Sequence, residues 1–444
     1  MNLNTKQSEF IKMAMAGKNC FLSGGGGVGK TFTINYFKKM IPWKKVVCTA
    51  STGIASIQQD NGMTIHSWAG LGTFNHPNQL FNIINSDFFD KIVGKIQECD
   101  VLIIDEVSML RGDQVDLLNM VLQNARHSSK PFGGIQVIFV GDFCQLPPVI
   151  RKDEEITHEW AFESKAWEEG EVKTFILDQV MRQSDAEFIN ALNDIRFGHL
   201  TENAIKMLDS VRETVFPRGV SPLKLMPINK GVDEWNHKMI KSIKSEPFTS
   251  EAFIYGQTKK FYHDVISSTL APKFLQLKEG CQLMLLRNHA GGDYVNGTMV
   301  KYVGHGMANV EFKNIPDSNT LQHCIFVQKQ DGTRLAIPKH TFCIGDKFTE
   351  KYFCFESNKE QTKTRSQGEF TQYPARLGYA ITIHKSQGMT LKHLEINCHK
   401  MFAEGQLYVS LSRATGKEGL RVLNFKKYHL KANKKAVQFY EGNL

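Results

Sequence analysis

Phe21-Leu-Ser-Gly-Gly-Gly-Gly-Val-Gly-Lys-Thr31 is a glycine-rich turn that joins an apolar run to a run compatible with a helix. It contains the spacing G-x-x-x-x-G-K-[ST], filled by Gly24, Gly29, Lys30 and Thr31. The glycines allow successive backbone N–H groups to point at phosphate oxygens, at the positive end of the helix dipole. The order of strand, loop and helix therefore predicts a nucleotide-binding phosphate loop rather than a glycine-rich linker.

Each part of this loop has a predicted task. Lys30 would reach the β and γ phosphates of ATP, and the Thr31 hydroxyl would bind Mg²⁺. The remaining positions would contribute their backbone to the phosphate cradle: Gly24, Gly25, Gly26, Gly27, Val28 and Gly29. Gln7, just ahead of a helix predicted over residues 8–15, is counted with the cofactor-binding residues. ATP and Mg²⁺ are thus the expected cofactors.

Polar side chains follow two apolar runs that are predicted to be buried strands. Asp105 and Glu106 come directly after the first run, residues 99–104, at the strand end where open α/β sheets bind ligands. In a phosphate-loop ATPase, Asp105 would hold Mg²⁺ and Glu106 would orient or deprotonate the attacking water. Gln145, after the second run, would contact the γ-phosphate or that water. The alternatives are an acidic pair that only caps a strand and a turn glutamine without a ligand.

Bulk composition sets wider limits on the chain. Its 444 residues, 41% of them hydrophobic, suggest about three globular domains. The net charge of +9 and a pI near 8.9 favour a polyanionic partner, although a solvated basic surface explains them equally well. Nine scattered cysteines without a C-x-x-C pair predict reduced thiols in a cytosolic-type compartment, such as a bacterial cytoplasm or an infected host cytoplasm. No signal peptide, transmembrane segment or membrane association is expected.

The order of the motifs resembles superfamily-1B DNA helicases. Five stretches are similar to motifs I, Ia, Ib, II and III of that superfamily: residues 24–31, 49–55, 62–68, 104–109 and 141–148. Lys130-Pro-Phe-Gly-Gly-Ile-Gln136 resembles the signature segment of the Pif (petite integration frequency) branch, which the sister RecD-like and Dda-like branches lack. The chain looks like a minimal core form of that branch.

The resemblance implies an α/β fold with two RecA-like P-loop NTPase domains. The first would span residues 1–172, with a small wedge insertion or hairpin at about 70–96. The second would comprise residues 173–298 and 373–444, separated by an inserted β-barrel of the Src-homology-three type over 299–372. Independently of the resemblance, short alternating runs in that interval predict an antiparallel β module. Within it, the polar stretch 350–372 predicts a surface loop.

Three further motifs lie in the second predicted domain. Residues 177–183 resemble motif IV, which implies that Arg182 reaches the γ-phosphate, although without the resemblance a surface ion pair would explain Arg182 better. Residues 379–390 resemble motif V, with Gln387 and Gly388 facing the nucleotide. Residues 406–414 resemble motif VI, whose arginine finger is Arg413. The predicted catalytic set is Lys30, Asp105, Glu106, Gln145, Arg182 and Arg413.

A translocase must hold the nucleic-acid backbone whatever its sequence, using hydroxyls, amides and cations on phosphates and aromatic faces on bases. The resemblance assigns backbone contacts to Thr52, Thr64, His66, Ser67, Asn229, Lys230, His384 and Lys385. Phe74 is a candidate wedge or stacking pin, although a phenylalanine in this region is more often a core residue. The implied partners are single-stranded DNA, forked or 5′-tailed duplex DNA, and replication or single-strand-binding proteins, and the implied state is a monomer.

The sequence therefore predicts an ATP-driven, Mg²⁺-dependent DNA helicase that moves 5′-to-3′. Such a motor would serve DNA replication, repair or recombination. Two other classes remain open: a remodelling ATPase that switches on DNA without processive translocation, and a single-strand-binding protein with a degenerate ATPase. Ring-forming remodelling ATPases take their arginine finger from a neighbouring subunit, so two arginines within one chain argue against the first. The intact catalytic set argues against the second.

Overall fold

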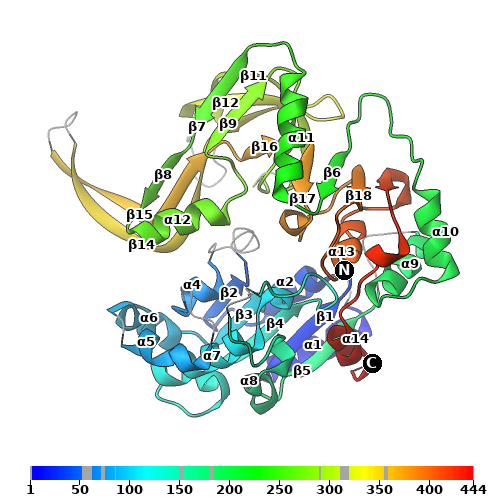
Figure 1. Ribbon diagram of the computed structural model, residues 1–444. Coiled ribbons are helices and arrows are strands. Elements are labelled where there is room, and N and C mark those ends of the chain that lie inside the picture. Colours follow the sequence, from blue (N-terminus) through cyan, green and yellow to red (C-terminus); the bar gives the residue numbers. More distant parts are fainter. Residues whose placement is uncertain are drawn as a thin grey trace. The chain divides into compact units, whose positions relative to one another are not determined.

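The computed structural model describes residues 3–52, 63–71, 76–85, 87–150, 154–179, 185–289, 292–310, 320–354 and 359–443. The chain divides into two compact units (Figure 1). Unit 1 contains Met1–Thr214 and Cys398–Leu444, and unit 2 contains Val215–Asn397. In the described part of the chain, no helix has both the length and the apolar character needed to cross a membrane.

Unit 1 is built on a parallel sheet with the strand order β2-β3-β4-β1-β5. Its strands are β1 (Cys20–Gly24), β2 (Val46–Ala50), β3 (Val101–Asp105), β4 (Gln136–Gly141) and β5 (Lys173–Leu177). The three central strands are almost entirely buried, which explains why they read as continuous apolar runs in the sequence. Because the strands are parallel, the polar residues that follow β1, β3 and β4 meet at one edge of the sheet.

Helices cover both faces of this sheet. The helices of unit 1 are α1 (Thr5–Met15), α2 (Lys30–Met40), α4 (Ile65–Trp68), α5 (Leu80–Ile84), α6 (Asp87–Gln97), α7 (Gly112–Ala125), α8 (Lys165–Glu169), α9 (Ala186–Arg196), α10 (Glu202–Ser210), α13 (Gln406–Leu411) and α14 (Lys434–Glu441). The short strand β19 (Leu420–Leu423) also lies in this unit. Cys20 and Leu22 of β1 pack in one core with α1 and α2. Phe21, between them, contacts Trp167 of α8. Alternate side chains of one strand thus face different helical layers.

Unit 2 combines a small parallel pairing with antiparallel sheets. Strand β6 (Leu223–Met226) pairs in parallel with β17 (Ala380–Thr382) and β18 (Leu394–Asn397). A second sheet has the order β13-β12-β11-β10-β16, with β10 (Gln282–Leu285), β11 (Met299–Val310), β12 (Thr320–Gln328), β13 (Arg334–Pro338) and β16 (Ala375–Leu377). Unit 2 also contains β7 (Pro247–Glu251), β8 (Phe253–Gly256), β9 (Phe274–Lys278), α11 (Asn229–Lys241) and α12 (Lys259–Ser268).

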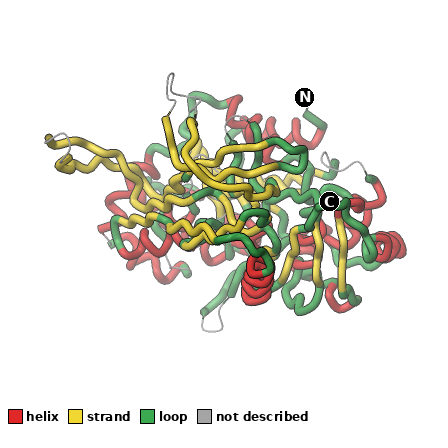
Figure 2. Tube along the Cα trace, turned by 90° about the horizontal axis from the view of Figure 1, so that it is seen from above, coloured by secondary structure: helices red, strands yellow, loops and turns green. Residues whose placement is uncertain are grey.

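The surface loop predicted over residues 350–372 is wrong. Strands β14 (His340–Cys354) and β15 (Lys359–Gln372) form a long antiparallel ribbon there, drawn in yellow in Figure 2. Among the residues that the structure describes, β8 pairs with residues 368–371 of β15, and no third strand is paired with the rest of the ribbon. Side chains on such a ribbon reach solvent, as Thr362 and Thr364 do. Other polar side chains of the same stretch, Ser366 and Gln372, are buried. The polar composition of the stretch therefore did not indicate a lack of strand structure.

The structure differs from two other predictions made from the sequence. The described residues of the region at about 70–96 are helical, in η1 (Pro77–Gln79), α5 and α6, and contain no hairpin. β5, which a domain boundary at residue 172 would give to the second domain, pairs with β1 in the first sheet. The pairing of β5 with β1, a strand far away in the chain, leaves no local signal in the sequence. This explains why the predicted boundary separates β5 from the first sheet. The wedge and the domain boundaries remain predictions.

The signature stretch, residues 130–136, joins three elements of unit 1. Its turn η3 (Pro131–Gly134) buries Phe132 against Phe139 of β4. Gly133 has φ +61°, and a Cβ there would lie 2.5 Å from the carbonyl oxygen of Leu122 in α7. Gln136 donates from Nε2 to the carbonyl oxygens of Ala14 and Lys18, at 2.7 and 2.8 Å. The segment therefore ties α7 and the end of α1 to β4.

Candidate active site

The phosphate loop lies between β1 and α2, as predicted. Gly29 is the N-cap of α2 with φ +88°, a left-handed conformation that glycine adopts without strain. Gly24 has φ +141°, and a Cβ there would lie 2.4 Å from the carbonyl oxygen of Leu177. Both positions therefore require glycine, the first for its backbone angle and the second for space as well. The loop backbone leads directly into the N-terminus of α2, where anions bind favourably.

Lys30 folds back onto the loop. Its Nζ donates to the carbonyl oxygens of Gly24 and Gly25, at 2.7 and 2.9 Å. Burial lowers the pKa of the Lys30 ammonium, while the negative charges of Asp142, Glu106 and Asp105 act in the opposite direction. The ammonium thus lies within electrostatic reach of the acidic strand ends. Thr31 is exposed in the first turn of α2, so its hydroxyl is accessible to a bound metal ion.

The acidic pair lies at the end of β3. Oδ1 of Asp105 accepts a hydrogen bond from the backbone N–H of Glu106, at 2.8 Å. Glu106 itself has φ +54°, in the left-handed region, and its carbonyl oxygen accepts from the Ser51 hydroxyl at 2.6 Å. Burial and the Asp105 charge raise the pKa of Glu106 to about 7, against the opposing charges of Arg413 and Lys30. A carboxylate that titrates near neutral pH is well suited to act as a general base.

Replacing Glu106 by glutamine is expected to lower the ATP turnover number by about 10²–10⁴-fold while raising thermal stability at alkaline pH. The folded-state pKa of about 7 lies above the ordinary value of 4.5. The charged carboxylate therefore disfavours the folded state above pH 7, and this cost disappears as the pH falls from 7 towards 4.5. Because glutamine removes the charge, the gain in melting temperature should be larger at pH 8 than at pH 5.

Thermal unfolding of both proteins at the two pH values measures this effect, alongside DNA-stimulated ATP hydrolysis. The exposed Glu98 offers a matched control, because Glu98→Gln makes the same chemical change outside the site. Equal stability gains at pH 8 and pH 5 would contradict a raised pKa at Glu106. An unchanged turnover number would remove Glu106 from the role of general base.

The turn after β4 carries Gln145. Its backbone N–H donates to the carbonyl oxygen of Asp142 at 2.9 Å, and its side chain is buried. Gly405, with φ +71°, approaches this turn so closely that a Cβ there would lie 2.5 Å from the Gln145 carbonyl oxygen. Gly405 is also the N-cap of α13. The predicted γ-phosphate sensor is therefore packed against the start of the helix that leads to Arg413.

Arg413 lies within unit 1, two residues beyond the end of α13. Its side chain is 4% exposed, with Nε donating to the Val409 carbonyl oxygen at 3.0 Å and Nη2 donating to the Ser412 hydroxyl at 2.9 Å. Its charge lowers the pKa of Glu106, so the two groups are electrostatic neighbours. A Cβ at Gly26 would lie 3.3 Å from Cβ of Ser412. The structure thus brings the predicted arginine finger to the phosphate loop.

Several other predicted residues have structural partners of their own or lie outside the described residues. Gln7 is buried in α1, where its Oε1 accepts from the Asn4 backbone N–H at 3.0 Å, so its predicted nucleotide contact stays a prediction. Thr52 is half-buried just beyond β2. Arg182 and Phe74 lie outside the described residues.

Three of the DNA-binding residues predicted in unit 1, Thr64, His66 and Ser67, lie at α4. Oγ1 of Thr64 accepts from the Ser67 backbone N–H at 3.2 Å and caps the helix. His66 Nε2 lies 2.9 Å from the Gln114 amide nitrogen, and burial lowers the pKa of His66 to about 4. The imidazole is therefore neutral at physiological pH. Because the amide N–H donates to Nε2, the ring proton must be on Nδ1. His66 can offer a phosphate a neutral N–H donor rather than a positive charge.

The remaining predicted contacts lie in unit 2. Asn229 and Lys230 are exposed in the first turn of α11. The turn η5 (His384–Ser386) holds His384 and Lys385, and burial lowers the pKa of both side chains. Gln387 is buried beside this turn, and Gly388 follows with φ +73°. Asn229 and Lys230 thus begin a helix, whereas Gln387 and Gly388 follow the end of η5. The ligand contacts of these six residues remain predictions.

A buried ion pair beside the phosphate loop is a feature that the sequence did not reveal. Asp142 follows β4 and is fully buried, and Arg196 at the end of α9 is 5% exposed. Arg196 donates from Nε and Nη2 to the Asp142 carboxylate at 2.9–3.2 Å. Burial alone would raise the pKa of Asp142, but the guanidinium holds it below its ordinary value. The one available signal was an aspartate directly after a buried strand, since such a charge needs a partner.

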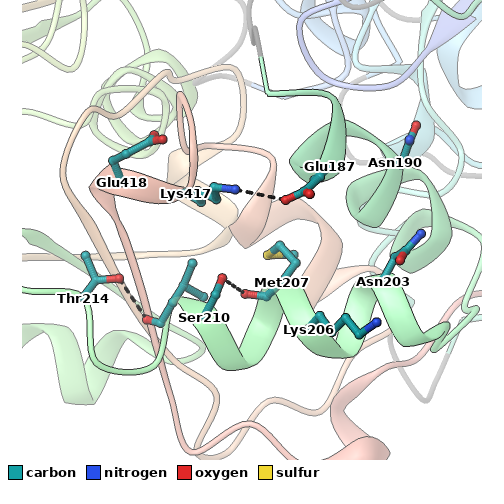
Figure 3. A pocket seen from close by; sticks show the side chains of 10 residues that line it. Glu187, Asn190, Asn203, Lys206, Met207, Ser210, Thr214, Lys417 and Glu418 are labelled. Carbon is teal, nitrogen blue, oxygen red and sulfur yellow. Dashed lines mark hydrogen bonds and ion pairs between the residues drawn. The ribbon is translucent and has the colours of Figure 1, made fainter.

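A pocket of about 600 Å³ lies elsewhere in unit 1, between α9, α10 and the turn η6 (Lys417–Gly419) (Figure 3). Lys417 crosses it to Glu187 at 3.1 Å and also pairs with Asp185 at 3.2 Å. The lining mixes both charges with the apolar side chains of Met207 and Val211. These contacts tie η6 to α9, and none of the lining residues belongs to the predicted catalytic set.

Comparison with known proteins identifies the family. Residues 2–206 match the PIF1-like helicase family. Over 442 residues the chain is 30% identical to the ATP-dependent DNA helicase Pif1 of Bdellovibrio bacteriovorus, across 99% of this chain and 92% of that protein. The chain belongs to the PIF1-like helicase family. The resemblance seen in its motifs is therefore confirmed.

Other PIF1-like proteins extend the comparison. The ATP-dependent DNA helicase Pif1 of Psychrobacter sp. is 32% identical over 461 residues, which cover 94% of this chain. This chain spans 67% of the length of that relative and 64% of the Danio rerio PIF1 helicase. The crystal structure of Bacteroides sp Pif1 in complex with ADP-AlF4 is similar with a TM-score of 0.79 and 26% identity, over all of this chain and 97% of that chain. Bacteroides Pif1 bound to ssDNA has a TM-score of 0.69. The α/β fold predicted from the sequence is thus confirmed.

Proposed function

We propose that this PIF1-like chain is an ATP-driven motor that moves 5′-to-3′ along single-stranded DNA and unwinds duplex DNA. The observation that carries the proposal is the gathering of Lys30, Glu106 and Arg413 at one phosphate loop within unit 1. The relatives bearing the Pif1 and RRM3 names are ATP-dependent DNA helicases, which supports the same activity here.

ATP hydrolysis would use groups that already lie at the loop. Lys30 would exchange its bonds with the Gly24 and Gly25 carbonyls for β- and γ-phosphate oxygens. Glu106, with its pKa near neutrality, would accept a proton from the attacking water. The Arg413 guanidinium would stabilise the negative charge that spreads over the γ-phosphoryl oxygens in the transition state.

The residues also fit a bound Mg²⁺. The Thr31 hydroxyl and the Asp105 carboxylate are hard oxygen donors of the kind that Mg²⁺ selects, and Mg²⁺ when bound neutralises charge on the phosphates. Asp105 is oriented for this role because the Glu106 backbone N–H holds one of its carboxylate oxygens. Gln145 would contact the γ-phosphate and transmit its loss to the start of α13 through the close approach of Gly405.

The architecture is assigned in the same way. We assign the sheet of β10–β13 and β16 to the inserted module of the Src-homology-three type, since its strands pair antiparallel around a core that includes Leu283, Val300 and Ile325. This assignment extends the module beyond the predicted interval 299–372, because β10 precedes residue 299 and β16 follows residue 372. Helices α5 and α6 correspond to the wedge insertion of the first RecA-like domain, and β6, β17 and β18 belong to the second. The chain would work as a monomer on single-stranded and forked DNA.

The grip on DNA would rest largely on uncharged donors. Thr64, His66 and Ser67 at α4 present hydroxyls and a neutral imidazole, which suit a backbone that must be released at every step. Such contacts depend less on salt than contacts made by lysine or arginine. Lys230, exposed at the start of α11, would add a cationic contact.

Unwinding of two tailed duplexes tests the proposal. With ATP, the protein is expected to separate a duplex carrying a 5′ single-stranded tail at least tenfold faster than the same duplex with a 3′ tail. The reason is that the resemblance implies 5′-to-3′ movement. The Lys30→Ala variant should unwind neither duplex. Faster unwinding of the 3′-tailed substrate would overturn the direction. DNA-stimulated ATP hydrolysis without unwinding of either duplex would instead support the remodelling ATPase.

A further inference from the structure

The carboxylate of Asp142 joins three elements besides its own strand end. We name Asp142, Arg196, Tyr408 and Tyr440 the Asp142 cluster. In addition to the Arg196 pair, Oδ2 of Asp142 accepts from the Tyr408 hydroxyl at 2.9 Å, and Oδ1 accepts from the Tyr440 hydroxyl at 3.2 Å. Arg196 belongs to α9, Tyr408 to α13 and Tyr440 to α14. A single buried carboxylate thus holds two helices that come from the far end of the chain.

The proton of the Tyr440 hydroxyl can be assigned from its neighbours. The Phe143 backbone N–H donates to this hydroxyl oxygen at 2.9 Å, and the Ser23 hydroxyl lies 2.6 Å away. A tyrosine hydroxyl has one proton, and the Asp142 carboxylate can only accept, so Ser23 must be the donor to Tyr440. The Arg196 guanidinium also lies 4.6 Å from the Tyr440 ring centroid, in a cation–π contact. Each of these hydrogen bonds of Tyr440 therefore has a defined direction.

The cluster touches the phosphate loop at two points. Ser23 is the residue before Gly24, so Tyr440 reaches the base of the loop through it. A Cβ at Gly25 would lie 3.3 Å from the Tyr408 hydroxyl, which places that hydroxyl against the loop itself. α13, which carries Tyr408, leads within two residues to Arg413. The Tyr408 hydroxyl, which donates to Asp142, and Arg413, the predicted arginine finger, therefore belong to one short segment of the chain.

We infer that the Asp142 cluster is a positioning device for the arginine finger: it holds α13 in register with the phosphate loop, and so places Arg413 for the transition state. This inference rests on the proposed function. Tyr408, Tyr440 and Arg196 are positioning residues, because they act on the nucleotide through Arg413 and the loop. Asp142 and Gln145 share one hydrogen-bonded turn, which therefore carries both the γ-phosphate sensor and the anchor of the finger helix.

Removal of one hydroxyl tests this role. Tyr408→Phe is expected to lower the DNA-stimulated ATP turnover number roughly tenfold, because misplacement of a catalytic group by a fraction of an ångström raises the barrier while ground-state binding persists. The KM for ATP should change less than about twofold. Affinity for ADP with aluminium fluoride, which mimics the transition state, should fall roughly tenfold, while affinity for ADP alone stays the same.

A double-mutant cycle with Arg413→Ala separates positioning from a merely structural effect. In the Arg413→Ala background, Tyr408→Phe should no longer weaken binding of ADP with aluminium fluoride. The same loss in both backgrounds would overturn the inference, as would an unchanged turnover number in Tyr408→Phe. Tyr428→Phe is the matched control, because the Tyr428 side chain is 62% exposed in unit 1.

Two further measurements keep the outcomes distinct. If Tyr408→Phe does not fold, Tyr440→Phe removes a different hydroxyl of the Asp142 cluster and goes through the same cycle. Absence of DNA-stimulated hydrolysis in the unaltered protein would overturn the proposed function, and the inference with it. An active protein whose Tyr408 and Arg413 substitutions act independently would overturn the inference alone.

Discussion

Replacing Arg413 by alanine is expected to lower the DNA-stimulated ATP turnover number by about 10³-fold or more, within the range known for arginine fingers supplied within a chain. The guanidinium is buried beside the phosphate loop and is oriented by the Val409 carbonyl and the Ser412 hydroxyl. Its charge would therefore act in a site with little competing water, where electrostatic stabilisation is strongest. Steady-state ATP hydrolysis with saturating single-stranded DNA measures the loss.

ATP binding should survive this substitution better than hydrolysis, because Lys30 and the loop backbone supply most of the ground-state contacts. We expect the KM for ATP to rise less than about fivefold. Arg421→Ala is the matched control, since Arg421 lies on β19 and donates to the Thr214 carbonyl oxygen. A turnover number within tenfold of the unaltered protein would show that Arg413 is not the finger.

Removal of Arg413 should also change the acid–base behaviour of Glu106. Arg413 is one of two cations that lower the pKa of Glu106 against burial and the charge of Asp105. Without it, the acidic limb of the pH–rate profile should move to higher pH, so that less of the base is ionised at neutral pH. Part of the loss in rate would then come from the general base, and activity should recover partially as the pH is raised.

The parts of the site that could be predicted from the sequence are those encoded by short spacings. The phosphate loop, Asp105 and Glu106 each follow an apolar strand, and parallel strands bring their ends together whatever lies between them. Arg413 was found differently, through the resemblance of its motif. The structure places Arg413 beside these groups in unit 1, although the sequence assigned it to the second domain.

The Asp142 cluster could not be predicted because its contacts span the chain. Asp142 pairs with Arg196 across 54 positions, with Tyr408 across 266 and with Tyr440 across 298. No local pattern distinguishes these side chains, since Arg196 ends an ordinary amphipathic helix and Tyr440 follows the lysine-rich residues 426–435. Their common partner, the Asp142 carboxylate, becomes evident only in the structure, where β4, α9, α13 and α14 meet.

The β14–β15 ribbon illustrates a different limit of sequence analysis. Strands are recognised by alternation between a buried and an exposed face. In this ribbon polar residues occupy exposed positions, such as Thr362 and Thr364, and also buried ones, such as Gln372. Residues 350–372 therefore lack that alternation and resemble a polar loop. Glycine, proline and asparagine, which mark true loops, are sparse in this stretch, with Asn358 and Gly368 its only members. That scarcity was the available signal.

Replacing Arg196 by methionine is expected to destabilise the protein by about 3–5 kcal/mol, because it leaves the Asp142 carboxylate buried without a countercharge. Methionine keeps much of the side-chain volume, so the loss reflects charge more than a cavity. The Tyr408 and Tyr440 hydroxyls would still donate to Asp142, but neutral donors cannot replace a guanidinium. Thermal unfolding at pH 7.5 measures the change as a fall in melting temperature.

A second substitution should then restore stability. Adding Asp142→Asn to Arg196→Met removes the orphaned charge, while the asparagine carbonyl oxygen can still accept from the backbone N–H of Cys144, which here lies 3.1 Å from Oδ1. The double variant is therefore expected to melt at a higher temperature than Arg196→Met alone, although each single substitution lowers it. If the stability lost by the double variant instead equalled the sum of the losses of the two single variants, the ion pair would contribute through packing and not through its charges. ATP hydrolysis should stay impaired in the double variant even as its stability recovers. A neutral amide in place of the Asp142 carboxylate accepts a weaker hydrogen bond from the Tyr408 hydroxyl, and α13 is therefore held more weakly.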